Sequence, residues 1–416
     1  MSQPGDSIPR PTAGHKPMTL DDLQFLLSTE GDRWLKETAR SRFGFAVIPI
    51  TPHNHLQIAA HLRQQLPAAQ AQAVLETVIL RQQAVAKFSR ADQMFFTRPA
   101  LEQASAEAVS HYRAGRFARA GYSHIADLGC SIGGDALALA AHAQVTGVEW
   151  DAVRLAMAQE NVRIYGHGAQ FHPLQADLVE LTPLPVEAVF FDPARRDEHG
   201  RRFYSVHQYQ PPLSLIERWG EHTAVKISPG VDYAEIPAEA EAEFISLNGE
   251  MKECVLWTGD LRSGVNRRAT LLPAGDTLTD ADLPARPVPV TIPGRYLYEP
   301  DSAIIRAHLV QALAHRLGAR QIDADIAYLT SDAPLETPFA RRYVVEAVRP
   351  FQLKQLRHAL HQQQIGSVTI KKRGSPLQPE QLKRQLRLTG PVENHRILFL
   401  THIQGEPSVI IGWEDK

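Results

Sequence analysis

Short apolar runs and helix-forming segments alternate through the middle of the chain. The apolar runs cover residues 123–128, 144–150, 169–175, 187–191 and 223–227. Between them lie helical or long connecting segments, among which the alanine-rich stretches 136–143 and 152–165 have the clearest helical composition. Strands that alternate with helices form a parallel sheet. This pattern predicts a doubly wound α/β domain at the centre of the chain.

Four of the five apolar runs lead into an acidic residue. These residues are Asp127, Glu149, Asp177 and Asp192. The carboxyl ends of parallel strands meet at one edge of a sheet, and open α/β sheets bind their ligands there. The acidic residues therefore indicate a ligand site at the carboxyl edge of the predicted sheet.

Helical periodicity dominates the residues before this sheet. Thr19 is placed to cap a helix that runs to about residue 39, and Thr51-Pro52 and Pro67 open two further helices. One face of the third helix carries Val74, Val78, Val85 and Phe88. Another helix is expected at residues 100–112. We therefore predict a small helical bundle over residues 19–90, preceded by a proline-rich tail without an apolar core.

A hairpin, a linker and a second alternation of elements follow the sheet. Asn248-Gly249 separates the apolar segments 243–247 and 252–257, which is typical of a β-hairpin. One more strand is expected at 268–272, and the proline-rich residues 273–293 are expected to be a linker. Beyond them we expect strands at 326–331, 342–348, 367–372, 396–403 and 408–413, and helices at 303–317, 353–364 and 379–386. These elements predict a small α/β sandwich.

With 416 residues, the chain is too long for one compact domain. We divide it into a disordered tail (1–18), a helical region (19–115), a central α/β domain (116–275), a linker with a connecting α/β segment (276–345) and a C-terminal domain (346–416).

The composition is that of an ordinary globular protein, with 44% apolar residues and no apolar run near the roughly 18 residues needed to span a bilayer. Cys130 and Cys254 are too few for a disulfide framework, which suits a reducing cytoplasm. The 18 histidines are scattered, with no cysteine or carboxylate cluster beside them. We therefore expect a cytoplasmic protein without a metal site and without a membrane partner.

Charge is unevenly distributed, although the whole chain carries a formal net charge of only −2. Residues 341–396 contain 12 Lys and Arg against 3 Glu, a local balance of +9. Lys371, Lys372 and Arg373 follow one another at a predicted strand end inside this block. A compact basic patch is the usual footprint of phosphate binding, whereas a basic surface that is merely solvated is the alternative.

A glycine turn joins the first predicted strand to the next helix. Its order is Asp127-x-Gly129-x-x-x-Gly133-Gly134, with Ser131 where the dinucleotide fingerprint has its middle glycine. Glycines let a ligand approach the backbone closely, but similar turns also serve only to pack a strand against a helix. Glu149 lies 22 residues after Asp127, at the distance where a carboxylate binds ribose hydroxyls.

This loop resembles the D-x-G-x-G-x-G loop of class I methyltransferases that use S-adenosylmethionine (SAM), and Ser131 for glycine is a tolerated departure. The resemblance implies a Rossmann-like sheet with SAM as cofactor. Asp127, Gly129, Ser131 and Gly133 would then hold the methionine end of SAM. By the same resemblance Glu149 would bind the ribose, and Asp177 would face the adenine with Trp150 beside the ring.

The segment Phe95-Phe96-Thr97-Arg98-Pro99 is similar to a segment of trimethylguanosine synthases, the RNA-cap methyltransferases, that lies over the methionine end of SAM. The similarity adds Thr97 to the implied cofactor contacts. The alternative is a helix start that is packed by two phenylalanines.

Asp192-Pro193 resembles the motif with which amino-directed methyltransferases orient their acceptor. Ala194 and Arg195 depart from the proline and aromatic residue of that motif, which puts stacking on the target base in doubt. Asp192 would position the acceptor nitrogen, because methyl transfer from a sulfonium needs mainly alignment and a free lone pair. Arg195 and Arg196 are expected to contact substrate. Lys226, at the fifth strand end, either pairs with Asp192 or only caps its strand.

Neither cysteine is expected to act as a nucleophile, because Cys130 lies within the glycine turn and Cys254 alternates with apolar residues of a predicted strand. Both are interpreted as packing residues.

The C-terminal segments 296–306, 326–331, 368–374 and 388–401 resemble the THUMP-like tail of a family of bacterial class I SAM-dependent methyltransferases, and the resemblance covers nearly the whole chain. THUMP domains proper bind RNA. The resemblance thus implies methylation of a base nitrogen in a structured RNA, tRNA or rRNA, with Lys371, Lys372 and Arg373 contacting it. Two alternatives remain open: a methyltransferase for a small molecule or a protein, and a SAM- or RNA-binding protein without catalysis.

Overall fold

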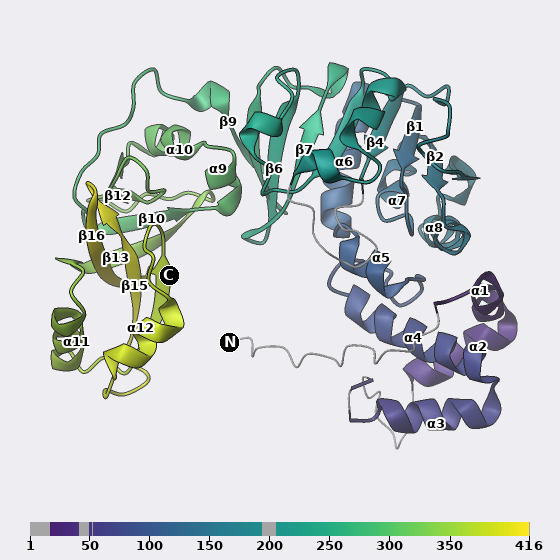
Figure 1. Ribbon diagram of the computed structural model, residues 1–416, viewed down its shortest axis with the longest axis horizontal. Coiled ribbons are helices and arrows are strands. Elements are labelled where there is room, and N and C mark those ends of the chain that lie inside the picture. Colours follow the sequence, from purple (N-terminus) through teal and green to yellow (C-terminus); the bar gives the residue numbers. More distant parts are fainter. Residues whose placement is uncertain (1–16, 41–49, 52, 194–204, 416) are drawn as a thin grey trace. The chain divides into compact units, whose positions relative to one another are not determined.

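The computed structural model describes residues 17–40, 50–51, 53–193 and 205–415 (Figure 1). Their contacts divide the chain into two compact units. The first comprises Met1–Ile227 with Trp257–Leu261, and the second comprises Ser228–Leu256 with Arg262–Lys416.

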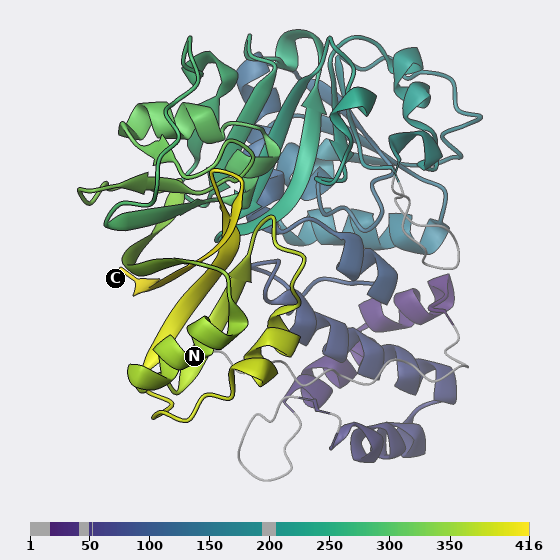
Figure 2. The same ribbon diagram turned by 60° about the vertical axis from the view of Figure 1, so that its left-hand side comes forward.

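Helices fill the first half of the first unit. They are α1 (Leu20–Leu27), α2 (Thr29–Ala39), α3 (His55–Gln65), α4 (Ala68–Ala84), α5 (Arg98–Gln103) and α6 (Glu107–Ala120). Helices α1, α2 and α3 each pack against α4, and the four lie together in both ribbon views (Figures 1 and 2). Thr19 caps α1 through a capping box with Asp22, as predicted. The predicted helical bundle is therefore confirmed.

Three details of the helical predictions are wrong. The first helix ends at Ser28, because the Ser28 hydroxyl accepts a hydrogen bond from the backbone N–H of Gly31 and so begins α2. Helix α3 begins after Asn54 and not at Thr51. Val85 is 68% exposed, although the other apolar residues of its expected face are buried.

The helix expected at residues 100–112 is interrupted in the same way. Ala104 and Ala106 have non-helical ψ values of 138° and 143°, so α5 ends and α6 begins as a separate helix. A short break of this kind leaves no Gly or Pro signal in the sequence, which explains why periodicity alone missed it.

Five parallel strands form the sheet of the first unit. They are β1 (His124–Leu128), β2 (Gln144–Glu149), β3 (Phe171–Gln175), β4 (Ala188–Phe191) and β5 (Thr223–Ile227), in the order β3-β2-β1-β4-β5. Helices α7 (Ala136–Leu139) and α8 (Ala152–Ile164) connect β1 to β2 and β2 to β3. Every residue of β4 and β5 is buried, as expected for central parallel strands. The predicted doubly wound α/β sheet is confirmed.

The second unit contains most of a hairpin and two further strands. These are β6 (Glu241–Leu247), β7 (Glu250–Trp257), β8 (Arg267–Leu272) and β9 (Asp276–Thr279), in the order β7-β6-β8-β9. Asn248 and Gly249 form the predicted turn, with φ of +55° and +78°. Strand β9 lies within the stretch expected to be a linker, because it pairs with β8 through a turn at Gly275.

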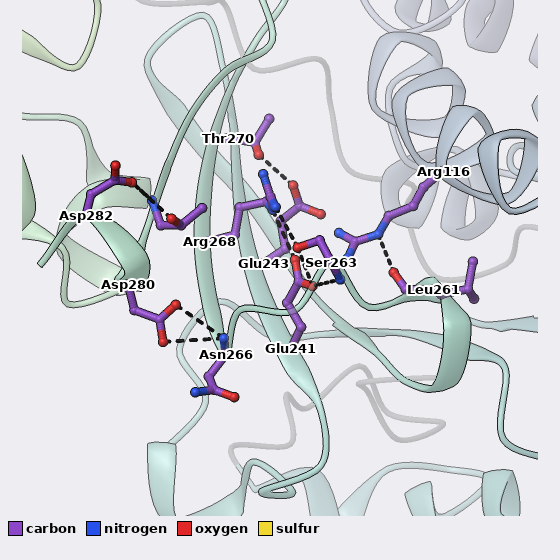
Figure 3. A network of polar contacts seen from close by, with 11 residues as sticks. Arg116, Glu241, Glu243, Leu261, Ser263, Asn266, Arg268, Thr270, Asp280 and Asp282 are labelled. Carbon is purple, nitrogen blue, oxygen red and sulfur yellow. Dashed lines mark hydrogen bonds and ion pairs between the residues drawn. The ribbon is translucent and has the colours of Figure 1, made fainter.

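Two buried carboxylates in β6 are satisfied within the second unit (Figure 3). Glu241 accepts hydrogen bonds from the backbone N–H (2.7 Å) and hydroxyl (2.9 Å) of Ser263, and from Nε of Arg268 (3.0 Å). Glu243 accepts one from the hydroxyl of Thr270 at 2.5 Å. Because buried carboxylates with such partners stabilise local structure, we assign them a structural role.

A mixed α/β module completes the second unit. Its strands are β10 (Tyr296–Pro300), β11 (Arg320–Gln321), β12 (Leu329–Ser331), β13 (Ala340–Pro350), β14 (Ser367–Lys372), β15 (His395–Ile403) and β16 (Glu406–Glu414), in the order β11-β12-β10-β13-β16-β15-β14. Its helices are α9 (Ser302–Arg306), α10 (Val310–Leu317), α11 (Leu353–Gln362) and α12 (Pro379–Leu386).

One core of this module lies between α11, α12 and one face of the sheet, and a second core covers the other face. The expected sandwich is therefore present. The single helix expected at 303–317 is wrong, because His308 takes a left-handed conformation (φ +56°) and separates α9 from α10.

In the part of the chain that the structure describes, no helix combines the length and apolar character needed to cross a membrane.

Candidate functional site

The register of the parallel strands aligns their carboxyl ends. Leu128 of β1 pairs with Val148 of β2 and with Phe191 of β4, and Phe191 pairs with Val225 of β5. The next residue along the chain is Gly129 after Leu128, Glu149 after Val148, Asp192 after Phe191 and Lys226 after Val225. We call Asp127, Glu149, Asp192 and Lys226 the strand-end site.

The glycine loop, residues 129–134, has the conformation that its glycines predict. Gly129 and Gly133 have φ of +77° and +81°, and Ser131 also lies in the left-handed region at +49°. A Cβ atom at Gly133 would lie 3.1 Å from the backbone of Ala158 in α8. A Cβ atom at Gly129 would lie 3.5 Å from the carbonyl oxygen of Asp192. The loop is therefore pressed between α8 and the end of β4.

Asp127 is the penultimate residue of β1 and is only 1% exposed. Its Oδ2 atom is buried and has no hydrogen-bond partner among the residues that the structure describes. Burial raises the pKa of this carboxyl well above its usual range, and the nearby charges of Asp135 and Asp192 raise it further, against the opposing effect of Arg113 and Lys226. An orphaned buried carboxylate oxygen is a ready acceptor for a ligand amine or hydroxyl.

Sequence reasoning missed the ion pair behind Asp127. Arg113 of α6 is 1% exposed, forms an ion pair with Asp135, and lies 4.9 Å from the ring centroid of Phe190. Ser110 donates to Asp135 at 2.8 Å. Burial opposes ionisation of Asp135, but Arg113, Lys226 and these hydrogen bonds outweigh it and lower its pKa. Arg113 gave no signal, because arginines on helices are usually solvated.

Glu149 is held as a fixed acceptor beside the loop. It is 4% exposed and accepts hydrogen bonds from the backbone N–H of Ser131 (3.1 Å) and Asp151 (3.0 Å). Arg154 lies 3.2 Å from its Oε1. Burial raises the pKa of Glu149, and Arg154 opposes that rise.

Trp150 and Asp177 lie at the rim of the site. The indole of Trp150 is 69% exposed and the Arg154 guanidinium is 5.5 Å from its ring centroid. Asp177 is also exposed, and its Oδ1 accepts from the backbone N–H of Val179 at 2.9 Å. A largely exposed indole next to buried acceptors provides a surface on which a flat ring could stack.

Asp192 and Lys226 form an ion pair. Nζ of Lys226 lies 2.5 Å from Oδ2 of Asp192, and the Lys226 side chain is only 3% exposed while that of Asp192 is 22% exposed. The pairing that the sequence left open is thus confirmed. Pro193 is buried beside it. Ala194, Arg195 and Arg196, for which the sequence predicted roles or departures, lie outside the described residues.

The segment predicted to cover the methionine end of SAM is linked to the glycine loop through the side chain of Asn161. Thr97 caps α5 by accepting from the backbone N–H of Ala100 at 3.4 Å, and the cavity of about 240 Å³ beside it is lined by residues of α1 and α4 and not by the glycine loop. Phe95 and Phe96 are buried. Asn161 of α8, which sequence reasoning did not single out, hydrogen bonds to the backbone of Phe95 and of Ile132. The asparagine lacked any motif around it that could have identified it.

The predicted packing roles of Cys130 and Cys254 agree with their burial, which raises the pKa of both thiols. Tyr209, which lies between β4 and β5, is also buried and therefore does not offer its ring to a ligand.

A polar pocket of about 500 Å³ lies within the second unit. Lys371 and Arg373 line it together with Glu299, Arg341 and the turn at Asn248 and Gly249. Lys371 forms an ion pair with Glu299, and Arg373 lies 3.9 Å from the same carboxylate. Lys372 is exposed. Two of the three predicted phosphate contacts therefore already share an anionic partner.

The residues at the strand ends fit SAM. The orphaned Oδ2 of Asp127 suits an amino group, the glycine loop leaves room for close backbone approach, and Glu149 supplies an oriented carboxylate for hydroxyl groups. The exposed Trp150 ring suits the adenine.

Known proteins resemble the chain over most of its length. An uncharacterized S-adenosylmethionine-dependent methyltransferase of Mycobacterium tuberculosis, found in two strains, is 35% identical over 339 residues, which cover 76% of this chain and 89% of the relative. The crystal structure of a protein named as a methyltransferase from Porphyromonas gingivalis W83 has a TM-score of 0.71 at 20% identity and covers 89% of this chain and 100% of its own. This structural likeness supports the fold.

Two family models match parts of the chain. One is described as THUMP domain-like and matches residues 340–413. The other is described as Domain of unknown function (DUF8688) and matches residues 19–84.

Proposed function

Because the chain belongs to the family of bacterial SAM-dependent methyltransferases that includes these mycobacterial relatives, we propose that it methylates a base nitrogen of a structured RNA. SAM is its cofactor, and the methyltransferase class follows from the family. The observation that carries the finer proposal is the Asp192–Lys226 pair, which abuts the glycine loop through the Asp192 carbonyl.

The acceptor side of the reaction falls to Asp192. SAM supplies an electrophilic methyl group on its sulfonium. The Asp192 carboxylate accepts a hydrogen bond from the acceptor N–H and so aims the nitrogen lone pair along the line of attack. Lys226, buried and 2.5 Å away, fixes the carboxylate in place. Pro193 keeps the strand end in one conformation, and Arg195 and Arg196 bind the phosphates that flank the target base.

The cofactor contacts are assigned to the other two residues of the strand-end site, to the glycine loop and to three residues around them. Asp127 accepts a hydrogen bond from the amino group of the methionine end, while Gly129, Ser131 and Gly133 form its cradle, with Thr97 closing the other side. Glu149 accepts from the ribose hydroxyls. Asp177 and Trp150 contact the adenine.

RNA is the proposed substrate because of the second unit. The THUMP domain-like match covers residues 340–413, which include the basic block at residues 341–396, and the polar pocket lies in the same unit. We assign phosphate contacts to the exposed Lys372 and Arg341, with Lys371 and Arg373 forming the pocket wall. Neutralisation of Lys371 by Glu299 limits its own pull on phosphate, so affinity arises from several modest contacts.

The test is a methyl-transfer assay with methyl-tritiated SAM and total RNA from a strain that lacks the gene, comparing wild type with Asp192→Ala. We expect label in RNA with wild type and a background level with the variant. Label in proteins or small molecules, and not in RNA, would indicate a methyltransferase that acts on a protein or a small molecule. SAM binding without label in any fraction would favour a binding protein without catalysis.

A further inference from the structure

One buried amide connects the glycine loop to the segment in front of α5. Asn161 is fully buried, and its Nδ2 donates to the carbonyl oxygens of Phe95 and Ile132, each at 2.9 Å. Its Oδ1 accepts from the backbone N–H of Phe95 at 2.8 Å. Both donors and one acceptor site of the amide are therefore used. Ile132 lies inside the glycine loop, and Phe95 lies two residues before Thr97, so one side chain holds both segments.

A second side chain holds only one of these segments. Arg81 of α4 donates from Nε to the carbonyl oxygen of Met94 (2.8 Å) and from Nη2 to that of Gln93 (2.6 Å). Its guanidinium also lies 4.8 Å from the ring centroid of Phe95. Burial lowers the pKa of Arg81 to about 10, which leaves it charged at neutral pH. Arg81 therefore fixes the segment to the helical region, and within the part of the chain that the structure describes it forms no hydrogen bond to the glycine loop.

We propose that Asn161 is a positioning residue for SAM, because it sets the distance between the glycine loop and the segment that carries Thr97 before the cofactor arrives. If the glycine loop and the Thr97 segment are already held at the separation that SAM requires, binding costs no further conformational entropy for ordering them. The inference rests on the family's use of SAM and does not depend on RNA as the substrate.

The chemistry of the amide makes the proposal specific. Asn161→Asp preserves size and can still accept from the N–H of Phe95, but a carboxylate cannot donate to the two carbonyl oxygens. The variant therefore removes the bond to the glycine loop and sets a negative charge against a carbonyl oxygen. Protonation of the new carboxyl at low pH restores one donor, so part of the lost function should return there.

The experiment measures SAM and S-adenosylhomocysteine affinity by titration calorimetry, together with thermal stability, on the full chain. Asn161→Asp should weaken both ligands at least tenfold at pH 8, with partial recovery relative to wild type at pH 6. Val162→Ala is the matched control, because Val162 is the next residue of α8 and equally buried. It should lose stability while keeping wild-type affinity.

Arg81→Leu keeps the proposal testable if Asn161→Asp does not fold. The substitution removes the bonds that hold the Thr97 segment to α4 and leaves the bonds of Asn161 in place. We expect SAM affinity to fall about threefold, because Asn161 still joins the segment to the glycine loop. The proposal is overturned if Val162→Ala and Asn161→Asp weaken SAM equally at equal loss of stability. It is also overturned if neither Asn161→Asp nor, in its place, Arg81→Leu changes the affinity.

Discussion

The strand-end site of the first unit and the polar pocket of the second unit hold their charges in opposite ways. Asp127 and Glu149 are almost completely buried. A backbone N–H group orients the Glu149 carboxylate, and burial and nearby charges set the pKa of Asp127. In the pocket, the half-buried side chains of Lys371 and Arg373 flank Glu299, and Arg341 is exposed to solvent. Burial strengthens the electrostatic interactions of each charge at the strand ends. The more solvated charges of the pocket each contribute a weaker interaction.

This contrast indicates different tasks. Buried, fixed acceptors suit one small ligand whose groups always occupy the same positions. Several cationic side chains that are only partly neutralised suit a large polyanion that is bound through many small contributions. The comparison therefore predicts large effects from changes at the strand ends and small, salt-dependent effects from changes at the pocket.

The largest effect is expected at Asp192. Asp192→Asn keeps the size of the side chain but loses the ion pair with Lys226, so the acceptor is held less precisely. We expect kcat to fall roughly 100-fold, the order of magnitude that a small misplacement of reacting groups costs. SAM affinity, measured by calorimetry, should stay within about threefold, because Asp192 is assigned to the acceptor and not to the cofactor. Loss of SAM binding in step with kcat would show that Asp192 supports the fold.

A smaller effect is expected at the glycine loop. Gly133→Ala places a Cβ atom 3.1 Å from the backbone of Ala158 at φ +81°, and should weaken SAM about tenfold. Gly121→Ala is the matched control, because Gly121 has the same φ of +81° and open space around its Cβ position. Both variants should lose about 1–2 kcal/mol of unfolding free energy from left-handed strain. Equal loss of SAM affinity in both would refute a specific role for the loop.

The raised pKa of Asp127 predicts a pH dependence. The folded, ligand-free protein holds a proton on Asp127 at pH values where the unfolded chain has released it, so this group's contribution to the unfolding free energy falls as pH rises from the ordinary carboxyl range through the raised pKa. A ligand amine favours the carboxylate, so SAM affinity should rise over the same window. Asp127→Asn should flatten both profiles, measured by calorimetry and denaturant titration. Unchanged slopes in the variant would exclude Asp127 as their source.

The smallest effect is expected at the polar pocket. Arg341→Ala should weaken RNA binding several-fold and reduce the salt dependence by about one released counterion. Lys354→Ala, also exposed and within the THUMP domain-like region, is the control for a diffuse basic surface. Filter binding at several salt concentrations separates the two models. An equal effect of both substitutions would replace the pocket with a general electrostatic attraction.

The two regions also differ in how far the sequence predicted them. The strand ends were predictable because each functional residue follows an apolar run, and parallel strands align such residues automatically. Arg113 and Asn161 were not, because their partners lie far away in the sequence and helical residues of these types are commonly exposed. The pocket is lined by several separate segments between Asn248 and Arg373. Its ion pairs join residues that are distant in sequence, and the periodicity of the sequence does not predict such pairs.

Helix breaks form a third class. Ser28 and His308 interrupt helices whose apolar periodicity continues across the break, so pattern alone joined the pieces. The turn at Asn248 and Gly249 was predictable, since its residues are those that accept positive φ readily.

The most direct test is nucleoside analysis of cellular RNA by mass spectrometry. RNA would be compared from a strain that lacks the gene and from the same strain complemented with wild type or with Asp192→Asn. We expect one N-methylated base that is present only with wild type. Identical nucleoside profiles in all three strains, or a modification on the ribose in place of the base, would contradict it.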